Sequence, residues 1–323
     1  TAPPRSRRAR GWVVAQLATA ALLLLTLTLG LLAVWHGAQD PTDGGRWVPA
    51  LSRAIAAAPG GIIDTPLVAA TFSADELPAG EREAVFYKLT IQPGASSPYL
   101  GGLFCGCRYE TITKGVGIEI VEEGRYTIRL EAPLRVQRAG STRVEQIPAG
   151  TDVTLGPGDA AIYPTYAAAG DIRNAGEEQV VLTGIVIYAM EASGTPLPQL
   201  PQGFSPIALT YTSPSDWDAF LPGPLHVGLR RVTLSPGTSI GPYAPAGLQG
   251  MRVDAGPVTR GFVARDASTP SGNPGRQSTG TTIPMFALPQ GLREIIANDG
   301  DDPAELLVLI IEPDVITLQA LTP

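Results

Sequence analysis

The chain has 323 residues, of which 44% are hydrophobic and 16% are charged, with 30 acidic against 23 basic residues. This length and hydrophobic content allow two domains with separate cores and exclude a largely disordered chain. The sparse, acidic charge excludes nucleic acid as a partner, because nucleic-acid binding needs a concentrated basic face. The 37 Gly and 31 Pro residues follow no short period, which favours many turns between short strands and predicts an all-β body.

The N-terminal segment has the pattern of a membrane anchor. Residues 1–10 form a basic tail that contains Arg5, Arg7, Arg8 and Arg10, whereas residues 11–35 contain no charged side chain. At about 1.5 Å per residue, a helix of roughly 24 residues covers a hydrocarbon core of about 30 Å. Trp12 and Trp35 stand at the two ends of this span, where indole rings prefer the membrane interface. We therefore predict a transmembrane helix over residues 11–35, in contact with membrane lipid.

The arginines of the tail also predict the orientation of the chain. Basic residues stay on the cytoplasmic side, so the body is expected on the periplasmic or extracellular side of a bacterial cytoplasmic membrane. The alternative is a cleaved signal peptide, which needs a shorter apolar region and a small-residue cleavage site. Residues 33–38 make a poor cleavage site, which favours a retained anchor.

Residues 36–60 are predicted to be a linker that contains a short amphipathic helix. Val48, Leu51 and Ile55 recur at helical spacing, just after Trp47. One interpretation is a cap packed on the first barrel of the body. The other is a segment that lies on the membrane or on a partner protein.

The body contains an internal repeat. Residues 86–99 and 229–243 both read as an alternating strand, a Pro-Gly turn, a Ser and a Pro-Tyr pair. Residues 173–187 and 297–311 share an Asn-x-Gly turn with acidic residues, followed by an apolar strand. Two copies of the same order of strands and turns predict a tandem of small β-barrels.

The Pro-rich residues 194–204 mark the joint between the copies. We accordingly predict one barrel over residues 61–193 and a second over residues 205–323. Further strands are expected at residues 117–121 and 125–130, in a sheet with one face in a core.

Residues 152–176 carry a resemblance to a known family. Gly158, Asp159, Pro164 and Asn174 stand at the spacing of the second sequence motif of the cupin family, and Pro93-Gly94 is similar to the opening of its first motif. Over roughly residues 64–315 the chain resembles a bicupin. The resemblance implies two tandem jelly-roll barrels, and it implies that the Gly, Asp and Asn residues preserve turn geometry.

The histidines that cupins use to bind metal are missing. Tyr99, Tyr166 and Tyr243 stand in or near those regions, and the chain has 2 His, at positions 36 and 226. A transition metal in such a barrel needs imidazole and carboxylate ligands that converge on one point. We therefore expect neither a metal nor another cofactor, and no oxygenase or isomerase chemistry.

The three tyrosines have two interpretations. They can fill the barrel interiors, each with its hydroxyl on one partner. Alternatively, Tyr99, Tyr166 and Arg173 form a pocket that holds a small polar or anionic ligand, with Tyr243 in the equivalent place of the second copy. Arginines that could contribute to the second pocket are Arg252, Arg260 and Arg293.

Cys105 and Cys107 are the candidates for redox or soft-metal chemistry. With one residue between them, a disulfide would be strained and easily reduced. Two thiolates alone make an incomplete metal site, which would need Tyr109, Glu110 or a partner chain to complete it. A strained disulfide, two inert thiols and a functional pair all remain open.

Taken together, these features predict a non-catalytic bicupin that serves as an accessory or scaffolding subunit of a larger membrane complex, respiratory or photosynthetic. The first alternative is an extracytoplasmic module that binds a sugar or an organic anion. The second is an enzyme with a non-standard site at the two cysteines.

Overall fold

The computed structural model describes residues 50–58, 60–80, 82–98, 115–164, 170–189, 201–212, 223–264, 275–288 and 292–314. The predicted basic tail, the transmembrane span and its two tryptophans lie outside these residues, as do Tyr99, Tyr166, Cys105 and Cys107. Within the described part of the chain, no helix has the length and apolar character needed to cross a bilayer.

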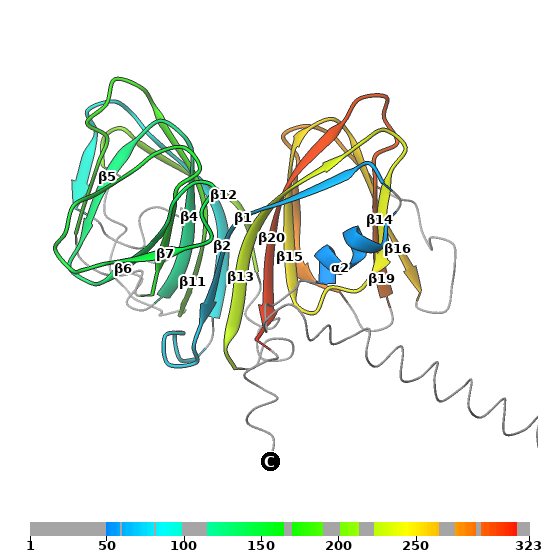
Figure 1. The fold of residues 1–323 in the computed structure, drawn as a ribbon, viewed down its shortest axis with the longest axis horizontal. Coiled ribbons are helices and arrows are strands. Elements are labelled where there is room, and N and C mark those ends of the chain that lie inside the picture. The colour runs from blue at the N-terminus through cyan, green and yellow to red at the C-terminus, as the bar shows by residue number, and fades with distance from the viewer. Residues whose placement is uncertain are drawn as a thin grey trace, which may run out of the picture. The chain divides into compact units, whose positions relative to one another are not determined.

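The described residues are mostly β-strands, which confirms the prediction of an all-β body (Figure 1). The helix α2 covers Ala50–Ala57. In chain order the strands are β1 (Ile62–Phe72), β2 (Arg82–Ile91), β3 (Ser96–Pro98), β4 (Gly115–Glu123), β5 (Tyr126–Leu130), β6 (Leu134–Gln137), β7 (Val144–Ile147), β8 (Val153–Leu155), β9 (Ala160–Tyr163), β10 (Gly170–Arg173), β11 (Val180–Ala189), β12 (Phe204–Tyr211), β13 (Leu225–Leu234), β14 (Ser239–Tyr243), β15 (Leu248–Ala255), β16 (Val258–Ala264), β17 (Gly275–Gln277), β18 (Thr282–Ala287), β19 (Leu292–Ala297) and β20 (Ala304–Pro313).

The first barrel consists of two antiparallel sheets. A seven-stranded sheet has the order β12-β2-β11-β4-β9-β6-β7, and a four-stranded sheet has the order β3-β10-β5-β8. Alternate residues of each strand point into the space between them, so Leu89 and Leu182 of the first sheet share a core with Ile128 and Ile172 of the second. These residues are fully buried.

The second barrel repeats this plan. A five-stranded sheet has the order β1-β13-β20-β15-β18, and a four-stranded sheet has the order β14-β19-β16-β17. The pairing of β13 with β20 and of β20 with β15 repeats that of β2 with β11 and of β11 with β4. The internal repeat in the sequence thus corresponds to a repeat in strand pairing.

The two copies exchange their first strands. The strand β1 precedes β2 in the chain, yet it pairs with β13 of the second barrel along its whole length. Conversely, β12 follows the Pro-rich joint and pairs with β2 of the first barrel. The barrels therefore do not follow the predicted ranges 61–193 and 205–323, because sequence similarity between repeats identifies a strand but not the copy with which it pairs.

An apolar layer joins the seven-stranded sheet to the five-stranded sheet. Phe86, Ile118 and Ile162 belong to the same buried cluster as Leu229 and Leu309. The strand β4 is consequently buried on both faces, unlike the one-sided burial predicted for this segment. For β5 the predicted one-sided burial is confirmed, because its residues alternate between buried and more exposed positions.

Polar contacts also cross the seam between the copies, where the seven-stranded sheet meets the five-stranded sheet. Arg252 of β15 donates from Nη1 to the hydroxyl of Thr183 at 2.8 Å and from Nη2 to the carboxylate of Glu122 at 2.7 Å. Its Nε lies 2.5 Å from Asp254. Burial alone would raise the pKa of Glu122, but the guanidinium of Arg252 holds it below its usual value. Arg252, a candidate ligand-binding residue in the sequence, thus connects the two copies.

The predicted amphipathic helix is present, and it packs between the two sheets of the second barrel instead of capping the first. The helix α2 contacts β14 and β1, and Leu51 is buried. The physical reason is connectivity: the chain passes from α2 directly into β1, which belongs to the second barrel. The prediction of a cap on the first barrel was therefore wrong.

Edge strands of both barrels contain prolines. Pro66 lies in β1, Pro206 in β12, Pro98 in β3 and Pro242 in β14. Three of these strands, β1, β12 and β14, also contain a shift in register. Prolines and bulges interrupt the row of free backbone groups at an edge, which prevents unwanted pairing with other strands.

Candidate functional site

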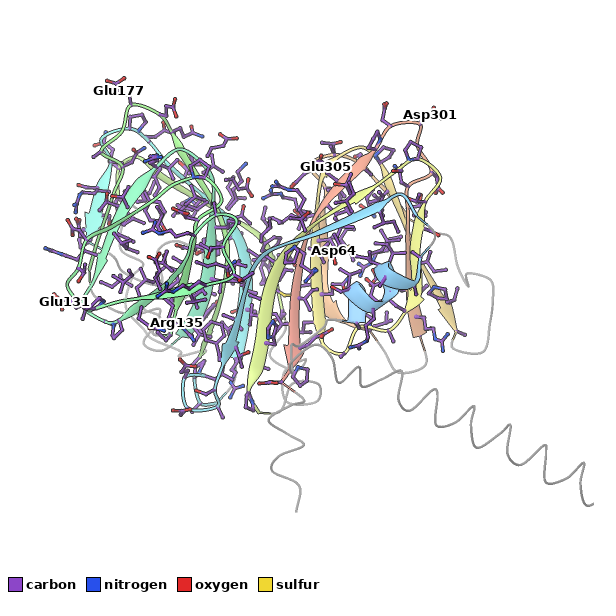
Figure 2. All side chains as sticks on the ribbon, in the orientation of Figure 1. Asp64, Glu131, Arg135, Glu177, Asp301 and Glu305 are labelled. Atoms are coloured by element: carbon purple, nitrogen blue, oxygen red, sulfur yellow. The ribbon has the colours of Figure 1, made fainter. Side chains whose placement is uncertain are left out.

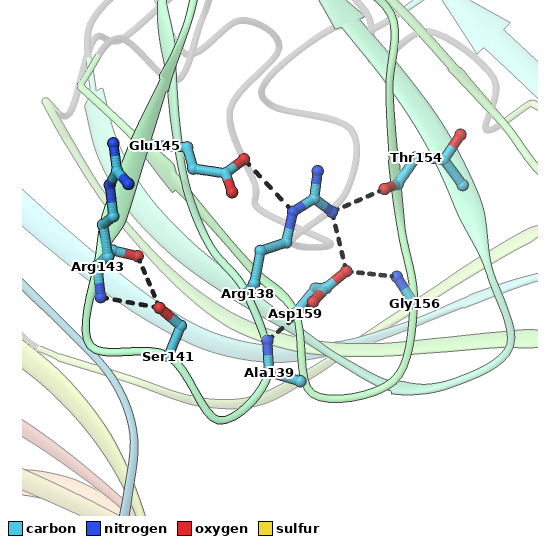
Figure 3. Close-up of polar contacts among 8 residues, drawn as sticks. All are labelled: Arg138, Ala139, Ser141, Arg143, Glu145, Thr154, Gly156 and Asp159. Atoms are coloured by element: carbon cyan, nitrogen blue, oxygen red, sulfur yellow. Dashed lines mark hydrogen bonds and ion pairs between the residues drawn. The ribbon is translucent and has the colours of Figure 1, made fainter.

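The turn before β9 retains the geometry that the sequence motif implied. Gly158 has a φ of +82°, which favours glycine. The carboxylate of Asp159 accepts the amides of Ala139 at 2.9 Å and Gly156 at 3.0 Å, and the guanidinium of Arg138 at 3.0 Å (Figure 3). Burial alone would raise the pKa of Asp159, but these donors hold it below its usual value. The carboxylate of Asp159 therefore stabilises the turns around it.

Asn174 fixes the next turn. Its side-chain amide donates to the carbonyls of Ile91 at 3.1 Å and Glu178 at 2.8 Å, and its Oδ1 accepts the amide of Gly176 at 3.0 Å. Asn174 is buried, whereas Glu177 extends from the same turn into solvent (Figure 2). The prediction that this asparagine preserves a turn is confirmed.

Asn298 forms the same three bonds in the second barrel. It donates to the carbonyls of Leu234 at 2.9 Å and Asp302 at 2.8 Å and accepts the amide of Gly300 at 2.9 Å. The weaker of the two sequence repeats therefore corresponds to an identical hydrogen-bonded turn in each copy.

The interior of the first barrel contains one buried carboxylate held by two tyrosines. Glu119 of β4 is 1% exposed, and its two oxygens accept the hydroxyls of Tyr87 and Tyr163. Small residues make room for this group: Gly184 and Ala161 are the cross-strand neighbours of Glu119. A Cβ at Gly184 would lie 2.8 Å from Cγ of Glu119 and 2.9 Å from the hydroxyl of Tyr87.

The interior of the second barrel contains a larger polar network. Glu294 of β19 is 1% exposed and accepts Nε of Arg260 and the hydroxyl of Tyr243, the latter at 3.2 Å. Gln249 reaches this group from the opposite sheet and donates to the hydroxyl of Tyr243 at 2.6 Å. The four side chains therefore bridge the two sheets through the interior of the barrel.

Burial controls the ionisation of this network. It raises the pKa of Glu294, although the guanidinium of Arg260 opposes the shift. Burial and the carboxylate of Glu294 together raise the pKa of Tyr243 well above its usual value, so its hydroxyl stays protonated and can donate. The network combines donors and acceptors that could bind a polar ligand, but in this structure they bind one another.

The residues predicted from sequence fall in different places. Tyr243 lies inside the second barrel, together with Arg260. Arg173 lies on the outer face of β10, where it binds Asp152 at 2.5 Å and Asp171 at 2.7 Å. The structure thus does not bring Arg173 into the first barrel, because its neighbour Ile172 takes the inward position.

Sequence reasoning did not identify Glu119, Gln249 or Glu294. A usable signal was present for Glu119, which is an acid in the middle of an apolar strand. For Gln249 and Glu294 the flanking residues give no comparable signal, since polar and apolar residues alternate in many exposed strands.

The donor set in the described residues does not fit the metal centre that the cupin resemblance implies. Such a centre needs several imidazoles and a carboxylate at one point. Across the ranges that the structure describes, no group of three or more His, Cys, Asp or Glu residues is placed to hold an ion. Inside the first barrel, Glu119 contributes a single carboxylate whose two oxygens already accept tyrosine hydroxyls.

No protein-family model and no curated protein sequence matches this chain. Among solved structures, it is similar to a deletion mutant of the oxalate decarboxylase of Bacillus subtilis, with 14% identity, a TM-score of 0.40, and 79% of this chain and 76% of that chain covered. A putative glyoxylate-induced protein of Pseudomonas aeruginosa has 13% identity and a TM-score of 0.38, with 75% and 79% covered. A cupin 2 conserved barrel domain protein of Leptotrichia buccalis has 10% identity and a TM-score of 0.32, with 76% and 89% covered. Likenesses this distant carry no conclusion about function, and the two barrels are defined by their strand pairing.

Proposed function

We propose that this chain is a non-catalytic bicupin that serves as an accessory subunit of a larger membrane complex, respiratory or photosynthetic. In this proposal residues 11–35 anchor it in a bacterial cytoplasmic membrane, and the two barrels stand on the extracytoplasmic side. The observation that supports the role is the state of the interior acids. Glu119 and Glu294 are both buried and bonded to side chains of the chain itself, as expected of a packed core.

The outer surface then provides the contact with a partner. Ile207 and Tyr211 of β12 are 57% and 59% exposed. In this proposal these two side chains form part of the contact with the partner protein. Because Pro206 interrupts the same edge, we expect contact through side chains and not by addition of a partner strand.

Extraction of the native membrane in mild detergent tests the accessory role. The intact chain should co-purify with other subunits in fixed stoichiometry, and a lone monomer would contradict the proposal. A variant with Ile207→Ser and Tyr211→Ser should lose the partner while staying in the membrane fraction. The matched control is Ile63→Ser, which removes another exposed side chain, 64% exposed, from the edge strand β1.

A second candidate function is the binding of a sugar or an organic anion. The observation that favours it is the network of Tyr243, Gln249, Glu294 and Arg260 inside the second barrel, since buried ionic groups are costly and often serve function. Thermal-shift screening against sugars and organic anions separates the possibilities. A site in the second barrel loses its ligand-dependent shift with Tyr243→Phe and keeps it with Arg173→Ala. The opposite result would place the ligand at Arg173, on the outer face of β10. No shift with any ligand would exclude this function for the compounds tested.

A further inference from the structure

The helix α2 occupies the interior of the second barrel. The amide of Ala50 donates to the carboxylate of Glu312 on β20, in the five-stranded sheet. The hydroxyl of Ser52 donates to Asp64 on β1 at 3.1 Å, and the helix packs against β14 of the facing sheet. Because its partners belong to both sheets, α2 lies between them, as Figure 1 also shows.

The five-stranded sheet presents polar and ionisable groups near α2. Asp64 binds Arg230 through two bonds of 2.8 and 2.6 Å, and Figure 2 labels Asp64 on the strand beside the helix. His226 is the cross-strand partner of Glu312 and lies with Nδ1 3.2 Å from the hydroxyl of Thr71. Both His226 and Glu312 are buried.

The helix buries only a small part of its own surface. Of its eight residues, Ala50 and Leu51 are buried, whereas Arg53, Ala56 and Ala57 are exposed. An isolated helix of this length is unstable in water, so α2 depends on its docking to stay folded. Segments with little buried apolar surface open locally at a lower free-energy cost than the whole fold.

We propose that α2 is a detachable plug, which occupies the second barrel as an internal ligand would and opens the polar interior to solvent when it is released. The strands of the barrel keep their pairing during this opening. Glu312, His226, Arg230 and Asp64 are the groups that become accessible. The inference does not depend on the accessory role proposed above, since it concerns a movement inside the second barrel.

The ionisation of these groups supports the idea that the plug controls access. Burial raises the pKa of Glu312, although Ala246, Ala50 and Arg53 oppose the shift. Burial also lowers the pKa of His226 to about 4, and Arg230 adds to this while Asp314 opposes it. Release of α2 would hydrate both groups, which should return each pKa toward its ordinary value.

Two measurements on the full chain test the proposal. In hydrogen exchange, the amides of residues 50–57 should exchange at least about 100-fold faster than those of β13 and β20, because they open without global unfolding. In NMR titration, His226 reports on access to the interior, and His36→Gln removes the only other histidine. Leu51→Ser should raise the pKa of His226 by at least about one unit while β13 and β20 stay protected.

The matched control is Ala56→Ser, the same introduced residue on the exposed side of the same helix. It should leave both the exchange rates and the pKa of His226 unchanged. Exchange of α2 only together with β13 and β20 would overturn the proposal, and so would global unfolding by Leu51→Ser. Faster exchange of α2 in Leu51→Ser with no change in the pKa of His226 would overturn it as well. Ser52→Ala removes the hydrogen bond from the helix to Asp64. It should raise the exchange rates of residues 50–57 and the pKa of His226 by less than Leu51→Ser does.

Discussion

Gly184 lies in a row of residues that runs across three strands of the first barrel. Its cross-strand partners are Tyr87 on one side and Glu119 on the other. The absence of a side chain at this position allows the phenol and the carboxylate to meet over the backbone of β11. At the scale of single residues, the polar group in this core therefore depends on a glycine that contributes only space.

Gly184→Ala should destabilise the chain by about 3 kcal/mol, because its Cβ would lie 2.7 Å from the carbonyl of Ile118 and 2.8 Å from Glu119. Gly228→Ala is the matched control. Gly228 also lies inside a long strand, and its Cβ would meet no atom closer than 3.6 Å. Urea denaturation of both variants measures the difference, and equal losses would contradict this close packing around Gly184.

His226 predicts a dependence of stability on pH. Its pKa is lowered to about 4 in the folded chain, from 6.5 for the side chain in water. Between these values the unfolded chain binds more protons, so stability falls as the pH falls. The contribution is fully present above pH 6.5 and lost below pH 4, and it amounts to about 3 kcal/mol at most.

Urea denaturation at pH 7.5 and at pH 4.5 should show a smaller difference in stability for His226→Gln than for the unchanged chain. His36→Gln should behave like the unchanged chain. If His226→Gln keeps the full difference, the loss of stability in acid comes from other groups, and the burial of His226 does not control it.

Some features of single residues could be predicted from the sequence. Gly158, Asp159 and Asn174 were expected to preserve turns, as the resemblance to the second cupin motif implied, and this motif can be read within a short stretch of sequence. The roles of Glu119 and Glu294 could not be predicted in the same way. Their partners come from other strands, at separations of 32 and 44 residues for Glu119.

The position of an arginine, between two sheets or on an outer face, determines how much it contributes to stability. Arg252 and Arg173 each bind acidic side chains, but Arg252 is 11% exposed in the seam between the copies and Arg173 is 35% exposed on an outer face. A charge pair in a buried seam leaves an uncompensated charge when one partner is removed, whereas an exposed pair is screened by water. The same residue type therefore has different consequences in the two elements.

Arg252→Met should cost about 3 kcal/mol, whereas Arg173→Met should cost clearly less, because water screens the ion pairs of Arg173. A double-mutant cycle with Glu122→Gln should give a coupling of at least about 1 kcal/mol for Arg252 across the seam. The free energies come from urea denaturation. A coupling near zero would mean that Glu122 and Arg252 do not interact in solution.

The elements themselves were largely predictable, and their neighbours were not. Alternation of apolar residues indicates a strand and the face that is buried. It fails for β4, since apolar residues on both faces serve two different cores. The helix α2 was predicted from its spacing, but its position on the second barrel follows from the exchange of β1, which leaves no trace in local sequence.

The exchange of first strands makes the two copies one cooperative molecule. Each copy supplies a strand to the other barrel, so neither copy can complete its own sheet. The apolar layer between the sheets adds to this dependence. At the scale of the whole molecule, we expect a single folding unit despite the internal repeat.

Cleavage of the covalent joint tests this expectation. A protease site inserted within residues 190–200 would separate the copies in the chain without altering β1 or β12. The two fragments should elute together in size-exclusion chromatography under native conditions, because ten residues of β1 stay paired with β13. A control insertion without cleavage should elute at the same volume, and separation of the fragments at neutral pH would contradict strand exchange.

The exchanged strand also sets a waiting time during synthesis. β1 leaves the ribosome about 150 residues before β13, which at roughly 5–20 residues per second is an interval of about 8–30 s. Throughout this interval Val68 and Phe72, fully or almost fully buried in the finished protein, have no partner strand. Pro66 and the adjacent register shift make β1 a poor template for any strand that is synthesised before β13. They therefore protect the nascent chain as well as the folded one from incorrect strand pairing.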